Sequence, residues 1–380
     1  MRLLSGPDQA RWGGRAGRPG RRAAGVAATA IGLILVAGCQ FPGTGSSAGS
    51  GPTASGTIIV AAAPGVADAP LYIGIRDGLF SRAGLTVKVV SNLSAQQEMS
   101  ALHSGSANIV FADYADMFYA QEQTQSPHLL TVADGYDAGP SVMEILTLPG
   151  SPIVSPRYLA GKTIGTAKPQ LMPTRGPGGG FRPYSQETLA AWSVLNSDNV
   201  DPTTIHWRPM AATRLLGALK THRVDAILAS EPTIYEAESQ LGAVPVLDAC
   251  TGATANLPLY GYFTNKAYAG QHADVVTAFR AALEKAQAQA AMTAPLQTAL
   301  TKSAGLRPQT AALVTFGTYP TTLSAQNIER VVKLPPIGDV QPRPGVPAQS
   351  HRPILPPYPT VAKAAVVLCS SQVAAIRYER

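Results

Sequence analysis

Residues 70–80 read Pro-Leu-Tyr-Ile-Gly-Ile-Arg-Asp-Gly-Leu-Phe, and residues 83–87 read Ala-Gly-Leu-Thr-Val. Pro70 suits the first position of a helix, and apolar side chains then recur every four residues on one face. Gly84 is placed to end that helix. An apolar run at 57–61 precedes the helix and another, at 86–90, follows it. The stretch therefore predicts a strand–helix–strand unit.

The same alternation continues along the chain. Further strands are expected at 108–112, 129–133, 143–148, 162–166, 205–209, 224–229, 244–247 and 257–263, with helical segments among them. Strands that alternate with helices favour an α/β fold with mostly parallel sheets. In such sheets ligands bind outside the carboxyl ends of the strands, often against helix N-termini.

Length and composition fit a folded, two-part protein. The chain has 380 residues, of which 45% are hydrophobic and 14% charged, so it can form a core and is not of the disordered class. The net charge is +7, but six Arg and one Asp precede residue 23, and the remainder carries only +2. The charge therefore does not indicate a nucleic-acid-binding face.

The N-terminal region predicts export and anchoring. After Arg21-Arg22, an apolar run over 23–37 is shorter than the ~20 residues that span a bilayer, which favours an export signal peptide over residues 1–38. Val36-Ala37-Gly38-Cys39 resembles the lipobox of bacterial lipoproteins, whose Cys is acylated with fatty acids such as palmitate. The alternative is an ordinary signal peptide beside a chance Cys.

Residues 39–56, rich in Gly, Ser and Thr, predict a flexible tether. We therefore expect a lipid-anchored protein on the extracytoplasmic face of the cell membrane. The paired arginines leave the general and twin-arginine export routes open.

Catalytic and metal-binding motifs are weak. Residues 45–49 fit G-x-S-x-G but lie in the tether, and residues 161–163 resemble the end of a P-loop except that Pro156 stands where Gly is required. The six His are scattered without metal-ligand spacing. We therefore expect no metal, no cofactor and no catalytic residue. Whether Cys250 and Cys369 pair is open.

Several segments together resemble a known family. Residues 70–87 are similar to the start of the substrate-binding lipoproteins of ABC importers for sulfonates, nitrate, taurine and thiamine-pyrimidine precursors. The resemblance continues in order at 99–105, 108–112, 159–165 and 219–232, and covers about 57–332. Asn108 replaces the family's usual Asp.

The resemblance implies a periplasmic-binding-protein type II fold, in which two α/β lobes joined by a two-stranded hinge close over a small molecule. Such a protein delivers its ligand to a membrane permease and its ATPase, and we expect a monomer. We place the first lobe at 57–148 plus 257–333 and the second at 152–247. The loop 169–183 and the Pro-rich tail 334–380 depart from the family.

Candidate ligand-binding residues follow from strand ends in the first lobe and helix starts in the second. They are Asp68, Asn92, Asp113, Tyr114 and Tyr136 on one side, and Ser185, Gln186 and Glu231 on the other. Arg175, Arg182 and Tyr184, from the loop 169–183, are further candidates. For Asp113 and Glu231 the alternative role is helix capping.

The candidate acids favour an amino-bearing heterocycle of the aminopyrimidine kind, because two carboxylates would repel a bare anion in a closed site. The loop arginines favour the alternative, an aliphatic sulfonate, nitrate or taurine. A second alternative is the enzyme of the same fold that makes the thiamine pyrimidine. It would need a Lys, for which Lys168 is a candidate, and a reactive His, and the export signal disfavours it. A third is a ligand sensor or adhesion lipoprotein.

Overall fold

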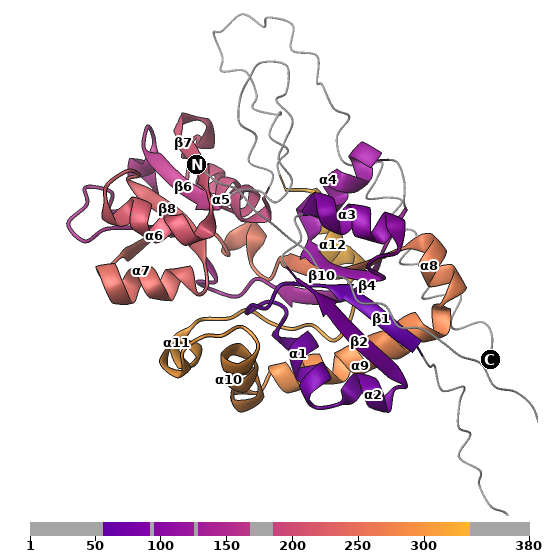
Figure 1. Ribbon diagram of the computed structural model, residues 1–380. Coiled ribbons are helices and arrows are strands. Elements are labelled where there is room, and N and C mark those ends of the chain that lie inside the picture. The colour runs from indigo at the N-terminus through magenta and orange to yellow at the C-terminus, as the bar shows by residue number, and fades with distance from the viewer. Residues whose placement is uncertain (1–55, 92–94, 125–127, 168–184, 335–380) are drawn as a thin grey trace, which may run out of the picture. The chain divides into compact units, whose positions relative to one another are not determined.

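The computed structural model describes residues 56–91, 95–124, 128–167 and 185–334 (Figure 1). These residues all belong to one unit of the chain and form two five-stranded sheets. The expected signal peptide, Cys39, the tether, the loop 169–183 and the Pro-rich tail lie outside the described residues. In the part that is described, no helix is both long and apolar enough to cross a membrane.

The first sheet has the strand order β2-β1-β3-β10-β4. Its strands are β1 (Gly56–Ala61), β2 (Leu85–Val90), β3 (Ile109–Asp113), β4 (Leu129–Asp137) and β10 (Pro258–Asn265). β1 pairs in parallel with β2 and β3, whereas β10 pairs antiparallel with both β3 and β4. One strand, β10, therefore runs against the other four.

The second sheet repeats this plan in the order β7-β6-β8-β5-β9. Its strands are β5 (Met143–Thr147), β6 (Thr163–Ala167), β7 (His206–Met210), β8 (Ala226–Ser230) and β9 (Val244–Asp248). β6 is parallel to β7 and β8, and β5 is antiparallel to β8 and β9. The expectation of an α/β fold with mostly parallel sheets is thus confirmed.

The chain passes between the sheets twice, through residues 138–142 after β4 and through residues 249–257 before β10. From the sequence alone, the first passage is expected after residue 148, where the first stretch of the first lobe ends. The sheets correct this, because β5 pairs with β8 and β9 in the second sheet. The five side chains of β5 are all buried, so its sequence has no alternation that would indicate its partner. The other lobe borders stay predictions.

Helices cover both faces of each sheet. They are α1 (Ala69–Arg76), α2 (Leu79–Arg82), α3 (Ala95–Ser104), α4 (Tyr114–Thr124), α5 (Gln186–Ser197), α6 (Ala212–Lys220), α7 (Thr233–Leu241), α8 (Lys266–Gln271), α9 (Ala273–Ala290), α10 (Thr293–Lys302), α11 (Pro308–Leu313) and α12 (Ala325–Val332), with short 3-10 turns at Pro156–Leu159, Pro202–Thr204 and Gly252–Thr254. On the first sheet, α1, α2 and α9 pack together on one face and α3, α4 and α12 on the other (Figure 1). On the second, α6 and α7 pack together against β8, which α5 also contacts.

A third segment approaches the passage between the sheets. The backbone of Asp137, at the end of β4, exchanges two hydrogen bonds with Thr318, at 3.0 and 3.1 Å. The approach requires glycine at position 317, since a Cβ there would stand 1.9 Å from the Asp137 carbonyl oxygen. This contact holds the segment 314–319 beside the residues that line the cavity described next.

Candidate functional site

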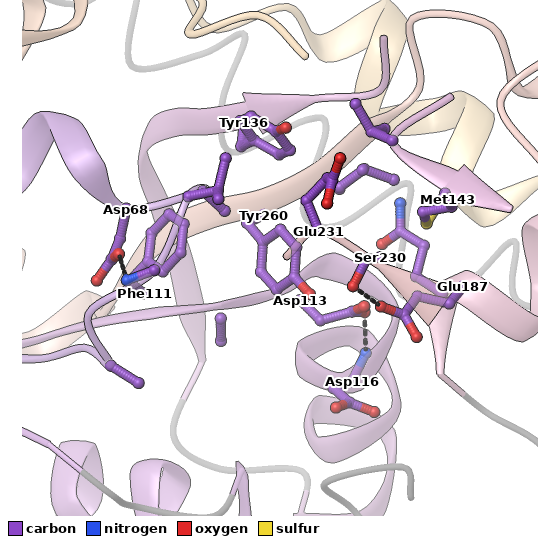
Figure 2. A pocket seen from close by; sticks show the side chains of 18 of the residues that line it. Asp68, Phe111, Asp113, Asp116, Tyr136, Met143, Glu187, Ser230, Glu231 and Tyr260 are labelled. Carbon is purple, nitrogen blue, oxygen red and sulfur yellow. Dashed lines mark hydrogen bonds between the residues drawn. The ribbon is translucent and has the colours of Figure 1, made fainter. Parts of the chain in front are cut away.

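A cavity of about 250 Å³ lies between the two sheets. The first sheet contributes the loop after β1, the end of β3 and the first turn of α4, and the second contributes the end of β8 and the first turn of α5 (Figure 2). Its lining residues are Ala63, Gly65, Val66, Ala67, Asp68, Glu98, Phe111, Ala112, Asp113, Asp116, Tyr136, Val142, Met143, Gln186, Glu187, Ser230, Glu231, Leu259 and Tyr260. The cavity therefore sits where α/β sheets bind ligands, at strand ends and helix starts.

The cavity is acidic. Six of its lining residues carry carboxyl groups: Asp68, Glu98, Asp113, Asp116, Glu187 and Glu231. The rest of the described lining consists of apolar, aromatic, amide and hydroxyl side chains and glycine. Among the described lining residues no cation balances these acids, and carboxyl groups that ionise in a site of low dielectric attract cations and N–H donors and repel anions.

Burial keeps these acids from ionising freely. Desolvation raises the pKa of Asp68 and of Glu98 to about 8, and that of Asp116 to about 7 with added repulsion from Glu98 and Glu187. Burial, followed by the charge of Asp116, raises the pKa of Asp113 well above its ordinary value. These carboxyl groups thus hold protons that a bound cation would displace.

Asp113 links a strand end to a helix start. It is the last residue of β3, and its Oδ1 accepts hydrogen bonds from the backbone N–H groups of Ala115 at 2.7 Å and Asp116 at 3.1 Å. This is the geometry of an N-cap on α4. Both roles that the sequence allowed for Asp113 are therefore compatible, since the capping carboxyl also lines the cavity.

Glu187 brings a carboxylate from the other sheet. It stands in the first turn of α5, and its Oε1 accepts a hydrogen bond from the Ser230 hydroxyl, at the end of β8, at 2.9 Å. Burial raises the pKa of Glu187, while this hydrogen bond opposes the rise. Glu187 and Asp113 interact electrostatically across the cavity, so that the two sheets present like charges to each other.

Aromatic rings form one wall. Phe111 on β3 and Tyr260 on β10 stack with ring centroids 5.5 Å apart and an interplanar angle of 16°. Tyr136 also lines the cavity, and its hydroxyl oxygen accepts a hydrogen bond from the backbone N–H of Gly317 at 2.6 Å. The stacked pair offers a flat ligand an apolar surface beside the acids.

Two lining residues tie the parts of the molecule together. Gln186 accepts a hydrogen bond from Ala115 N–H and donates one to the Pro258 carbonyl. Glu231 accepts from Tyr235 N–H at 3.1 Å and from Thr315 N–H at 2.9 Å, and burial raises its pKa. Each side chain joins the second sheet's helices to segments that belong with the first.

The sequence-predicted ligand residues meet only in part. Asp68, Asp113, Tyr136, Gln186 and Glu231 line the cavity together. The others do not join them: the Tyr114 hydroxyl donates to Asp134 at 3.1 Å inside the core, Ser185 accepts from Thr188 N–H as the N-cap of α5, and Asn92, Lys168, Arg175, Arg182 and Tyr184 lie outside the described residues.

Sequence reasoning missed half of the acids. Glu98, Asp116 and Glu187 stand in the first turns of α3, α4 and α5, where acids are common as complements to the helix dipole. The acids that follow Asp113 and Ser185 at the expected helix starts were therefore an available signal. Tyr260 lies directly opposite Asp113 in the pairing of β10 with β3, a register that the sequence does not reveal.

The described residues include one of the two cysteines whose pairing is open, and they also bear on whether the chain holds a metal ion. Cys250 is buried and unpaired there, while Cys369 lies outside it. Within the described ranges, no group of three or more His, Cys, Asp or Glu side chains is arranged to hold a metal ion.

The comparisons place the chain among known folds. The model of a family described as NMT1/THI5 like matches residues 67–298. No curated protein matches the chain in sequence.

Solved structures share the fold at low sequence identity. The periplasmic aliphatic sulphonate binding protein SsuA from Escherichia coli is 18% identical, covers 73% of this chain and 89% of its own, and gives a TM-score of 0.59. The periplasmic nitrate-binding protein NrtA from Synechocystis is 14% identical, with 86% and 89% covered and a TM-score of 0.58.

An enzyme has the same fold. The desulfurization enzyme DSZB is 16% identical, covers 73% of this chain and 91% of its own, and gives a TM-score of 0.55. Binding proteins and an enzyme thus share this architecture, and the expected two-lobed type II fold is confirmed. At such identities the likeness shows the fold alone, so that the function must be argued from the cavity.

Proposed function

The chain belongs to the NMT1/THI5-like family, and from that premise we propose that it is an extracytoplasmic solute-binding protein for a flat, amino-bearing heterocycle. One observation carries this: the cavity between the sheets combines six carboxyl groups with the stacked rings of Phe111 and Tyr260. Amino groups donate hydrogen bonds to carboxylates, and a planar ring stacks on aromatic side chains. An aminopyrimidine offers both.

The acids argue against the anion alternative. A sulfonate or nitrate between Asp113 on the first sheet and Glu187 on the second would oppose the ionisation of both carboxyl groups, whereas a cation or an N–H donor would favour it. SsuA from E. coli and NrtA are described as sulphonate- and nitrate-binding, and the described lining of this cavity has the opposite charge preference. The alternative rests on Arg175 and Arg182, outside the described residues.

The side chains that line the cavity favour a binding protein over an enzyme. The enzymatic alternative needs a Lys and a reactive His, whereas the described lining supplies carboxyl, amide, hydroxyl and apolar groups. The export signal expected over residues 1–38 also favours a role outside the cytoplasm. We propose that Cys39 anchors the protein by lipid to the cell membrane, where it passes its ligand to a permease and ATPase.

Calorimetric titration of the purified protein tests the ligand class. We expect a 4-aminopyrimidine to bind and ethanesulfonate not to bind. Glu187→Gln should lower the affinity for the aminopyrimidine by roughly 10- to 150-fold, because a hydrogen bond to a charged group is worth ~1.5–3 kcal/mol. Tighter binding of the sulfonate than of the aminopyrimidine would overturn the heterocycle.

Mass spectrometry of small molecules released from the purified protein tests the same proposal without a chosen probe. An amino-bearing heterocycle among them supports it. Genes for a permease and an ATPase beside this one would support delivery to an importer, and a lone gene would favour a ligand sensor.

A further inference from the structure

Within the described part of the chain, two carboxylate oxygens of the cavity have no hydrogen-bond partner. Asp68 is 1% exposed and Asp116 is 4% exposed, and Oδ2 of the first and Oδ1 of the second are both buried and unpartnered. Oδ1 of Asp68 accepts from Gly65 N–H at 2.8 Å, so that one oxygen is satisfied and the other is left over. Buried polar atoms nearly always have partners, and these two line the cavity. Each therefore indicates a donor that a ligand supplies.

The two oxygens belong to different ends of the cavity. Asp68 comes from the loop that joins β1 to α1 and lies beside Phe111, whereas Asp116 comes from the first turn of α4 below Asp113 (Figure 2). In the view of Figure 2 the ring of Tyr260 lies between the Asp68 end and the end that carries Asp113, Asp116 and Glu187. A ligand that reaches both oxygens must span that distance.

The middle of the cavity suits a flat apolar segment. Phe111 and Tyr260 stack there at 5.5 Å, and Leu259 and Met143 are further apolar lining residues. The two ends of the cavity differ in their number of carboxyl groups. Asp113 and Glu187 lie at the Asp116 end, and Asp116 also interacts electrostatically with Glu98.

We propose that the ligand has two nitrogen-centred donor groups on opposite sides of a flat apolar middle, one bound by Asp68 and the other by Asp116. The more strongly charged nitrogen binds at the Asp116 end, where four carboxyl groups gather. This rests on the proposed function, since it specifies the amino-bearing ligand of the same cavity.

Three small probes of one shape test the proposal by calorimetry. They are p-xylylenediamine, with an aminomethyl group at each end of a benzene ring, 4-methylbenzylamine, with one such group, and 4-methylbenzenesulfonate, with an anion instead. In the wild type the diamine should bind at least about 10-fold more tightly than the monoamine, as a second hydrogen bond to a charged group requires.

Two variants and a matched control locate the ends. Asp68→Asn should remove the advantage of the diamine over the monoamine, and Asp116→Asn should weaken the binding of both amines. Asp134→Asn is the control: Asp134 is 2% exposed and its Oδ2 is also buried and unpartnered, but it lies outside the cavity lining. It should change neither affinity.

The comparison of the diamine with the monoamine uses the wild-type protein and so does not depend on whether a variant folds. A diamine that binds no more tightly than the monoamine overturns the two-ended ligand while the proposed function stands. Failure of both amines to bind also overturns the two-ended ligand. If the sulfonate binds in their place, the proposed function is overturned as well. Loss of affinity in Asp134→Asn equal to that in Asp68→Asn also overturns the two-ended ligand, because the effect would then not come from the cavity.

Discussion

The side-chain oxygen of Gln186 accepts a hydrogen bond from the backbone N–H of Ala115 at 3.3 Å. Gln186 is the first residue of α5, which packs on the second sheet, and Ala115 lies in the first turn of α4, which packs on the first. The amide of the same side chain donates to the Pro258 carbonyl at the start of β10. Gln186 is 1% exposed, so that this link across the cavity is shielded from water.

Gln186→Leu keeps the side-chain volume and removes both hydrogen bonds. It removes the buried donor to the Pro258 carbonyl, whereas Ala115 N–H keeps its hydrogen bond to Asp113, so that we expect the free energy of unfolding to fall by about 1–3 kcal/mol. Denaturant titration measures this. Small-angle scattering should also show a larger average size, because a contact between the two sheets is lost. Gln271→Leu, at an exposed position at the end of α8, is the control, and an equal effect there would contradict the linking role.

Asp113 permits its two roles to be separated. Asp113→Asn retains an oxygen that accepts from Ala115 and Asp116 N–H, whereas Asp113→Ala removes it. We expect only the Ala variant to lose the cap, at about 0.5–2 kcal/mol of stability. Both variants remove the ionisable carboxyl group and should lower the affinity for an aminopyrimidine. Melting temperature and calorimetry report the two effects.

The outcome for Asp113→Asn decides between the roles. Unchanged affinity with an unchanged melting temperature would mean that the carboxyl is only a cap. Tighter binding of an alkyl sulfonate would mean that the ligand is an anion.

The sequence predicted the fold well because its signals are local. The run at 70–87 predicts one helix that begins at Pro70 and ends at Gly84, followed by β2. The structure divides that helix into α1 and α2 at Gly78, and both Gly78 and Gly84 have positive φ values, of 65° and 79°. The sequence could not predict to which sheet β5 belongs, because five buried side chains in a row carry no information about which strand pairs with them.

The site was predictable where it follows from a strand end and unpredictable where it depends on pairing. Asp113 ends β3 and Glu231 follows β8, so that both could be placed from the sequence. Tyr260 comes opposite Asp113 only because β10 returns from the second sheet to pair with β3. Tyr114 points to the core because the first residue of α4 packs its ring against Phe263, a contact between distant segments.

Membrane attachment is a prediction of the sequence alone. Cys39→Ala removes the thiol that we expect to be acylated, so that the protein should move from the membrane to the soluble fraction when cells are fractionated. Cys250→Ala, at a buried position in the folded part, is the matched control and should remain with the membrane. Unchanged partition of the Cys39 variant would contradict the lipobox.

The acidic cavity predicts how stability varies with pH. Asp68 and Glu98 have pKa values raised to about 8 by burial, whereas in the unfolded chain such groups titrate near 4. Between these values the folded state binds more protons than the unfolded state, so that the free energy of unfolding falls as pH rises from about 4 to about 8. Asp68→Asn removes one such group and should flatten the slope in denaturant titrations, whereas Asp198→Asn, at an exposed position, should not.

Ligand binding should carry the opposite dependence. A cation stabilises the ionised carboxylates, lowers their pKa values and so expels protons from the cavity. Benzamidine stays protonated across this range, and its affinity should therefore rise between pH 6 and pH 8, with protons released to the buffer. Calorimetry in phosphate and in Tris separates that release, since the two buffers take up protons with different heats. Equal heats in both buffers at pH 7, or an affinity that falls as pH rises, would show that the carboxyl groups of Asp68, Glu98 and Asp116 do not ionise on binding, and that the cavity accepts its ligand through neutral groups.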